Sequence, residues 1–165
     1  MAKGIDISIE RLTDRFEEKL WTDVSSASKD YFGRIYRNER DGDVIPQRFV
    51  SGNEYKDVLL NDKKAVNCFF DVQPEETYEF QFNANIWILF AVNLKILYPD
   101  VTDRATEYVH EDVIKEVKKI GGWSVTGLVR GLPAFADYSL VKDSDDMQPF
   151  YLFRINCEVK YPLNC

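Results

Sequence analysis

The chain has 165 residues, the size of one ordinary domain with a hydrophobic core. Apolar residues make up 45% of it and aromatic residues 14%, a composition that excludes a disordered protein. The 28 acidic residues exceed the 21 basic ones, and a formal charge of -7 without a segregated basic run argues against a nucleic-acid-binding protein. We therefore expect a single domain over residues 1–165.

The N-terminal part of the chain is predicted to begin with a helix and continue with short strands. Apolar residues from Ile5 to Leu20 recur at helical spacing, which predicts an amphipathic helix over residues 5–21. This segment lacks the blocks of a secretory signal. A short strand is expected over residues 30–37 and a turn-rich loop over residues 40–46, because Gly42 gives freedom and Pro46 cannot donate to a ladder.

The segment ANIWILFAVNLKILY, residues 84–98, raises the question of what covers so apolar a run. Its uninterrupted apolar part is too short for a membrane helix, which needs about 20 residues. Alternation favours a long strand whose even positions face the core, paired in a hairpin with a strand over residues 63–74 through Pro74 and Glu75. On the odd face, Trp87 and Leu89 need a second cover, from a helix of the same domain or from a neighbouring copy.

The C-terminal part is predicted to contain one helix and two strands. The apolar stripe of residues 102–120, and Gly121 directly after it, are typical of an amphipathic helix. Residues 123–140 contain glycines and Pro133, which suits a bent or edge strand, and residues 151–161 alternate as an antiparallel strand. The predicted fold class is α+β, a mainly antiparallel β-sheet with an N-terminal helix and a second amphipathic helix packed on it.

Motifs of known chemistry are missing from the sequence. The single histidine, His110, lies beside the stripe of the second helix, and we interpret it as a partly exposed structural residue. The acidic run over residues 143–146 lacks the glycine and glutamate of a calcium loop. The glycine-rich segments lack the order of a phosphate-binding loop, and three widely spaced cysteines indicate reduced thiols. We expect neither an enzyme nor a cofactor nor a metal site.

The order of the predicted elements resembles a family of virion proteins. An N-terminal helix, a strand with Phe32-Gly33-Arg34, a polar loop, two long strands, a helix and the closing strand YLFRINCEVKY follow one another. This layout resembles the tail-terminator and tail-completion proteins of tailed bacteriophages, small α+β proteins that form rings at the phage neck. The resemblance lies in pattern and not in single residues, and it implies a structural protein.

The resemblance implies a homo-oligomeric ring, six- or twelve-fold, in the neck of the virion, made in the host cytoplasm. The ring would contact portal-side and tail proteins, and DNA would pass through without specific binding. Trp87 and Leu89 are then candidates for the subunit interface. Candidates for a lumen-facing acidic surface are Asp41, Asp43, Asp143, Asp145 and Asp146. The alternative interpretations are a monomeric small-ligand or peptide-binding domain, with Trp87 and Trp123 in one pocket, and an enzyme with dispersed carboxylates.

Overall fold

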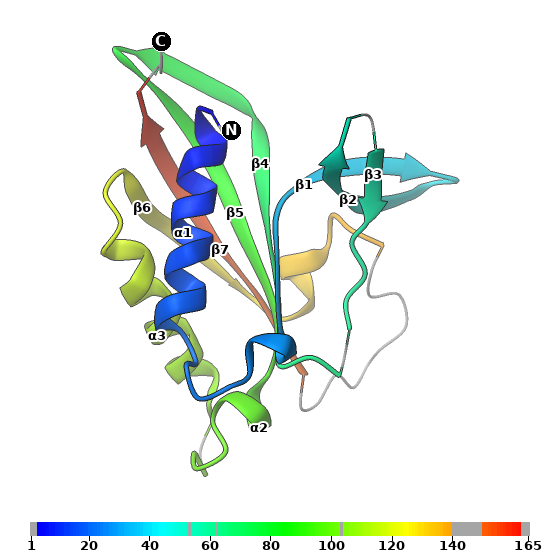
Figure 1. Ribbon diagram of the computed structural model, residues 1–165, viewed down its shortest axis with the longest axis vertical. Coiled ribbons are helices and arrows are strands. Elements are labelled where there is room, and N and C mark those ends of the chain that lie inside the picture. Colours follow the sequence, from blue (N-terminus) through cyan, green and yellow to red (C-terminus); the bar gives the residue numbers. More distant parts are fainter. Residues whose placement is uncertain (1–2, 53, 62, 103, 140–149, 163–165) are drawn as a thin grey trace.

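The computed structural model describes residues 3–52, 54–61, 63–102, 104–139 and 150–162. Within these ranges the strands form one seven-stranded sheet in the order β3-β2-β1-β4-β5-β7-β6 (Figure 1). The elements in chain order are α1 (Ile5–Lys19), η1 (Ser26–Ser28), β1 (Lys29–Arg40), β2 (Asp43–Ser51), β3 (Glu54–Asp57), β4 (Val66–Glu79), β5 (Gln81–Asn93), α2 (Leu94–Leu97), α3 (Thr106–Lys118), β6 (Trp123–Arg130), η2 (Leu132–Phe135) and β7 (Phe150–Tyr161).

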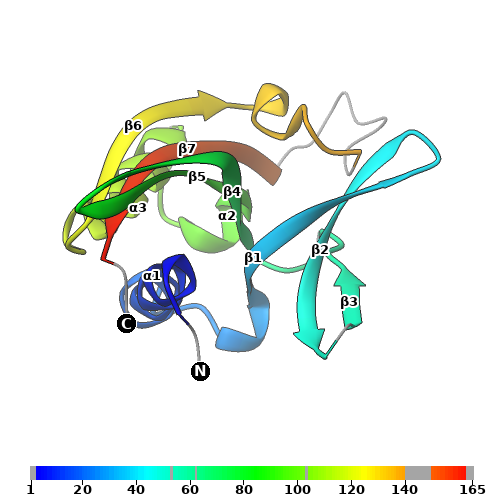
Figure 2. The same cartoon turned by 90° about the horizontal axis from the view of Figure 1, so that it is seen from above.

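The strand pairing is mainly antiparallel, as predicted. The pairs β1–β2, β2–β3, β4–β5, β5–β7 and β6–β7 are antiparallel, and β1–β4 is parallel. The predicted pairing of the two long strands and the edge position of β6 are both confirmed. The far half of β1 bends away from the main sheet together with β2 and β3 (Figure 2). The fold is therefore α+β, with a small projecting sheet beside the main one.

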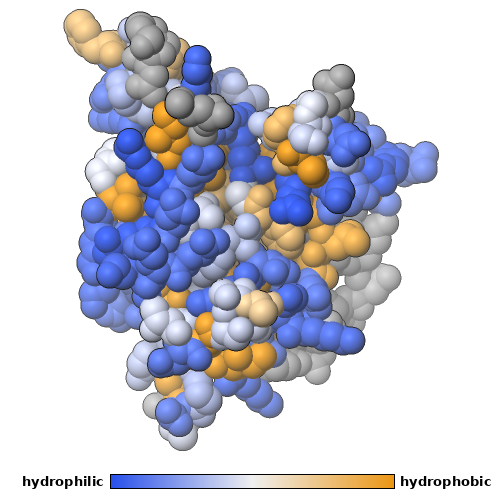
Figure 3. All heavy atoms as spheres, in the orientation of Figure 1, coloured by the Kyte–Doolittle hydropathy of each residue, from blue (hydrophilic) through white to orange (hydrophobic). Residues whose placement is uncertain are grey.

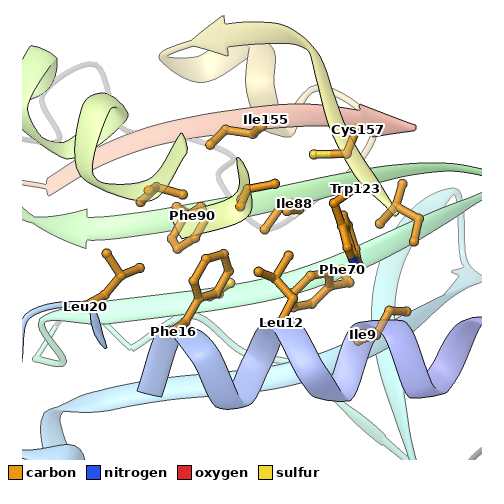
Figure 4. Close-up of a cluster of buried hydrophobic side chains, with 14 of the residues drawn as sticks. Ile9, Leu12, Phe16, Leu20, Phe70, Ile88, Phe90, Trp123, Ile155 and Cys157 are labelled. Atoms are coloured by element: carbon orange, nitrogen blue, oxygen red, sulfur yellow. The ribbon is translucent and has the colours of Figure 1, made fainter. Parts of the chain in front are cut away.

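The first face of the main sheet carries the larger hydrophobic cluster. The even positions of β5, from Ile86 to Val92, are buried there together with side chains of both longer helices, among them Phe16 and Val113. Figure 4 shows Phe16 pointing toward Ile88 and Phe90 of β5. The buried residues of α1 follow the predicted helical spacing, and Leu12 and Phe16 have no exposed surface. Each fully buried side chain of this size stabilises the fold by about 1.5 to 3 kcal/mol.

The second face of the sheet is covered at one end by the same chain. Leu89 and Phe69 have no exposed surface and pack against η2 and the residues that follow it. The ring of Phe69 lies 5.8 Å from the ring of Phe135 and 5.6 Å from that of Tyr138. The sequence left open whether the cover over Leu89 comes from the same domain or from a neighbouring copy. In the structure the same chain supplies it.

The end of β5 differs from the prediction of a strand over residues 84–98. The strand stops at Asn93, whose side-chain oxygen accepts hydrogen bonds from the backbone N–H groups of Lys95 and Ile96, at 3.1 and 3.3 Å. Such a cap favours the start of a helix, and α2 follows directly. Leu94 is therefore only partly buried against the first cluster, and Ile96 is exposed.

Two connections also differ from their predictions. The loop over residues 40–46 is only a two-residue turn, in which Asp41 and Gly42 both have positive φ, and Pro46 lies inside β2. Pro74 does not end β4 either: the register shifts between Val72 and Glu76, and the strand continues to Glu79. A bulge absorbs the proline, and the turn of the hairpin falls later, at Phe80.

Candidate interaction site

The β4–β5 hairpin extends past the end of the helix layer (Figure 1). We call its outer part, residues 75–82, the arm. Residues 75–81 are all exposed, although they continue two of the central strands of the sheet. Phe80 forms the turn between the paired residues Glu79 and Gln81, and its side chain is 93% exposed. The outermost end of the molecule at the upper left of Figure 3, where the arm ends, is hydrophobic.

The turn of the arm holds an unfavourable backbone conformation. Phe80 has φ of 67°, in the left-handed region that a bulky side chain rarely adopts. Such a conformation costs of the order of 1 kcal/mol or more, and outliers of this kind gather at binding sites. The exposed phenylalanine and its strained backbone therefore mark the arm as a functional candidate.

Aromatic contacts connect the arm to the body of the sheet. The ring of Phe82 lies 4.9 Å from that of Tyr78 and stacks at 5.2 Å on that of Tyr161 in β7. The Tyr161 hydroxyl donates a hydrogen bond of 3.1 Å to the Glu76 carboxylate. Burial and this carboxylate raise the pKa of Tyr161 to about 12, so the hydroxyl keeps its proton at neutral pH. These cross-strand pairs stiffen the hairpin and hold its tip away from the body.

The arm is acidic as well as aromatic. Its sequence, EETYEFQF, contains Glu75, Glu76 and Glu79 and no lysine or arginine. All three glutamates are exposed. The prediction from the sequence missed this site because the turn carries no glycine and the segment was assigned partly to a connection. The available signal was the cluster of three glutamates interleaved with aromatic residues between two apolar strands.

A basic pocket is lined in part by Leu94 and Lys95 of α2. This short helix lies toward the end of the molecule opposite the arm (Figure 1). The volume of the pocket is about 670 Å³. Among the described residues, the charged ones that line it are all cations: Lys95, Arg104 and Arg130. The rest of the lining includes Leu94, Tyr98, Val101 and Tyr151. Three large apolar or aromatic side chains on the segments of this pocket are exposed, namely Ile96, Tyr108 and Leu132.

Hydrogen bonds fix the aromatic walls of the basic pocket. The Tyr98 hydroxyl accepts a bond of 2.9 Å from Trp21 Nε1 and donates one of 2.6 Å to the Asp112 carboxylate. Burial, helped by Asp112, raises the pKa of Tyr98 above its ordinary value. At the rim Arg130 forms an ion pair with Glu107, and this hydrogen bond lowers the pKa of the Glu107 carboxyl. The pocket therefore has ordered walls before any ligand binds.

His110 lies behind this pocket and differs from its prediction. It is 4% exposed and therefore buried, where we expected a partly exposed residue. The reason is that α3 directs it toward β7: its Nε2 lies 2.8 Å from the Tyr151 hydroxyl, and its ring meets Phe153 edge-on at 5.1 Å. Burial lowers the pKa of His110, and the positive charge of Arg130 lowers it further. The imidazole is therefore neutral at pH 7.

Trp87, the predicted interface residue, is half-buried on the open part of the second face. The guanidinium carbon of Arg154 lies 3.7 Å from the centre of a Trp87 ring, and that of Arg37 lies 5.6 Å away. This is the geometry of cation–π contacts. Leu89, the other predicted interface residue, is fully buried by its own chain, so the interface prediction for this strand now depends on Trp87.

A buried carboxylate holds one of these arginines in place. Asp71 is 3% exposed, and its Oδ2 accepts hydrogen bonds from Arg37 Nε at 3.0 Å and Arg37 Nη2 at 2.8 Å. It also accepts a bond from the Tyr138 hydroxyl. Burial and the Asp71 carboxylate raise the pKa of Tyr138. A buried charge needs such partners, and this set fixes Arg37 beside Trp87.

The sequence predicted that Trp87 and Trp123 would line one ligand pocket, but the structure places them on opposite faces of the sheet. Trp123 is buried on the first face, where its ring lies 6.1 Å from that of Phe70, whereas Trp87 is on the second face. The two tryptophans thus cannot line one pocket. A different groove, of about 490 Å³, lies between α1 and strands β1 and β2. Its lining mixes charges, with Asp6, Glu10 and Asp14 on the helix and Arg34 and Arg48 on the strands.

The residues predicted to line a ring lumen are only partly described. Asp41 is exposed in the turn between β1 and β2, and Asp43 begins β2 and is half-buried. The remaining candidates, Asp143, Asp145 and Asp146, lie outside the described residues. The structure therefore places one acidic turn at the end of the projecting sheet and tests no further part of this prediction.

The described ranges contain neither a metal-binding cluster nor a membrane-spanning helix. No cluster of three or more histidine, cysteine or acidic side chains there could hold a metal ion. Cys68 and Cys157 are buried and free, and burial raises the pKa of both thiols, that of Cys157 to about 12. None of the helices in these ranges has the length and apolar character to cross a membrane.

No protein-family model matches the chain, and a search of curated proteins finds no match.

Proposed function

We propose that this protein is a structural subunit that assembles into a closed ring at the neck of a tailed bacteriophage, as a tail terminator or head–tail connector. The observation that carries the proposal is Phe80, a large apolar side chain 93% exposed on a strained turn at the end of a stiff arm. A single copy gains no stability from this arrangement, whereas a contact that buries Phe80 between copies would.

Ring assembly explains why apolar side chains remain exposed at more than one place. Each subunit of a ring uses two different surfaces, one toward each neighbour, and these heterologous contacts close when the rotation between copies is a whole fraction of a turn. Exposed aromatic residues lie on the arm and, far from it in the fold, on the projecting sheet and near α2, including Phe49, Tyr55 and Tyr108. A molecule with two such surfaces suits this kind of assembly.

The phage role is supported by the order of the elements and by charge. The chain runs from α1 through β1 and a polar hairpin to the long pair β4–β5, then α3 and the closing pair β6–β7, as in the neck proteins that it resembles. The net charge of -7 would keep DNA from adhering to a ring wall, because like charges repel. We propose a virion protein that acts by geometry, without a cofactor or catalysis, with portal-side and tail proteins as neighbours.

Light scattering across a wide range of protein concentration tests this proposal. We expect a species of six or twelve copies of the 19.2 kDa chain, with a closed ring and an open channel in negative-stain images. A gel-shift assay with duplex DNA at physiological salt should show no retention. A protein that stays monomeric at every concentration, and whose melting temperature rises with a peptide or small molecule, would instead support a monomeric binding domain.

A further inference from the structure

We infer that the arm of one copy docks in the basic pocket of the next copy, with the side chain of Phe80 inserted into the pocket. The inference rests on the proposed function, since it names the contact that would hold neighbouring ring subunits together. The arm and α2, which lines part of the basic pocket, lie toward opposite ends of the longest axis of the molecule (Figure 1). One copy therefore cannot close this contact on itself, and a chain of copies can.

The charges of the two surfaces are complementary. The arm carries three exposed glutamates and no cation, whereas Lys95, Arg104 and Arg130 are the charged residues that line the pocket. Arg130 has a partner in Glu107, but Lys95 and Arg104 are exposed at the rim. Such an arrangement steers two copies together and rejects the reverse pairing of arm with arm, because like charges would meet.

The apolar parts of the two surfaces also match. Phe80 and Tyr78 end the arm, and the pocket offers Leu94, Val101 and the ring of Tyr98. An aromatic side chain that enters a preformed pocket is the usual centre of a strong protein contact, while a charged rim surrounds it. A pocket of about 670 Å³ has room for a side chain of this size. The stiff arm loses little conformational freedom when it docks.

The groove beside α1 is a poorer partner for the arm. Its lining contains three carboxylates, Asp6, Glu10 and Asp14, against two arginines, and Arg34 already forms an ion pair of 3.2 Å with Asp6. An arm with three glutamates would meet repulsion along the helix side of that groove. The all-cationic lining of the basic pocket thus favours it over the groove.

Charge reversal tests the contact in the full chain. Glu79→Lys on the arm and Arg104→Glu in the pocket should each weaken association by about tenfold or more, the effect of about one lost ion pair at a packed contact. The double variant should regain most of the loss, because the reversed charges attract again. Both positions are exposed, so folding should be unchanged by circular dichroism. Glu10→Lys, on the rim of the other groove, is the matched control and should leave association as it is.

Removal of the apolar tip gives a second test. Phe80→Ala should weaken association by about thirtyfold, the scale of a central aromatic contact. Phe80→Tyr keeps the ring and should retain most of the affinity. If both variants form rings as readily as the unmodified protein, the arm is not the contact.

Photo-crosslinking locates the contact directly. A benzophenone amino acid at position 80 should give adducts between copies, with the labelled peptides falling within residues 94–106 or 130–132 or containing Tyr151. Rings with adducts elsewhere would overturn the docking while leaving the ring function standing. A monomer at every concentration, without adducts between copies, would overturn both proposals.

Discussion

On the first face of the sheet, α1 and α3 pack with β4, β5, β6 and β7 in one large cluster. Within the described residues, the cluster on the second face is smaller and gathers around η2, Tyr138 and Val58. Beyond that cluster, the second face presents Trp87 between two arginines over a buried aspartate. The helices of the chain thus close the first face. The second face has a buried part and an open part, and both occur along β5. Leu89 is fully buried, whereas Trp87, two positions away, is half-buried.

The largest loss of stability is expected when a charge replaces Leu89, the buried residue of this pair. Leu89→Asp should destabilise the protein by more than about 4 kcal/mol, because it places a charge in the buried cluster without a partner. Circular dichroism and urea unfolding should show loss of the folded state. Trp87→Asp, at the half-buried site beside Arg154, should stay folded. A folded Leu89→Asp protein would contradict the assignment of this position to the core.

Two phenylalanines on opposite faces compare the covers directly. Phe90→Ala on the first face and Phe69→Ala on the second both empty a fully buried site, and each should cost about 3 to 5 kcal/mol. We expect the larger loss for Phe90, because the short cover over Phe69 can move inward and partly fill the cavity. Urea unfolding of both variants measures the difference. A larger loss at Phe69 would show that η2 is as rigid a cover as the helices.

The buried carboxylate of the second face should matter more than its exposed neighbour. Asp71→Ala leaves Arg37 and the Tyr138 hydroxyl without their partner, and we expect a loss of about 2 to 3 kcal/mol, reduced because Arg37 reaches solvent. Asp137→Ala removes the exposed partner of the same arginine and should cost less than about 0.5 kcal/mol. Equal losses in the free energy of unfolding would mean that burial does not determine how much each ion pair stabilises the protein.

Trp87 should contribute modestly to stability and visibly to association. Trp87→Ala removes the cation–π contacts, worth about 1 kcal/mol, and opens part of the second face. As a candidate contact between ring subunits, it should also lower the stability of the ring, read from light scattering at decreasing concentration. Arg154→Gln, which keeps a polar side chain there, is the control. An unchanged ring would restrict the subunit contacts to other surfaces.

The smallest expected effect is the pH dependence of stability that His110, packed on the first face, contributes. Burial lowers the pKa of His110 in the folded protein below its ordinary value of about 6.5. Between these two values the unfolded chain binds the extra proton and the folded one does not, so stability should fall as the pH drops below about 6.5 and level off below the folded pKa. His110→Gln, which keeps a nitrogen toward Tyr151, should remove this part of the slope in urea unfolding between pH 5 and 7.5.

Much of the fold could be predicted because period and composition agree with it. The even positions of β5 and the helical spacing of α1 were predicted from alternation and amphipathicity, which tertiary contacts reinforce. What failed was local. Asn93 ends the strand by capping a helix. Pro46 lies inside β2, where the pairing with β3 begins only at the next residue, Gln47, and Pro74 lies at the register shift of β4.

The candidate site was harder to predict because it depends on distance in space. The sequence indicated Trp87 as an apolar residue that the predicted core would not cover, and in the structure its side chain is half-buried. The basic pocket combines residues from α2, the following loop and the end of β6, which no spacing in the sequence connects. The tip of the arm was missed because a turn centred on phenylalanine carries none of the usual glycine, asparagine or proline signals.

The place of β7 in the sheet has a consequence for how the chain folds. The strand lies between β5 and β6, yet it follows both of them in the sequence. Until residues 150–161 have left the ribosome, β5 presents an unpaired edge and β6 has no strand to join. Long-range pairing of this kind slows folding and exposes intermediates to aggregation. Synthesis of the last strand therefore sets the earliest moment at which a copy can become competent for assembly.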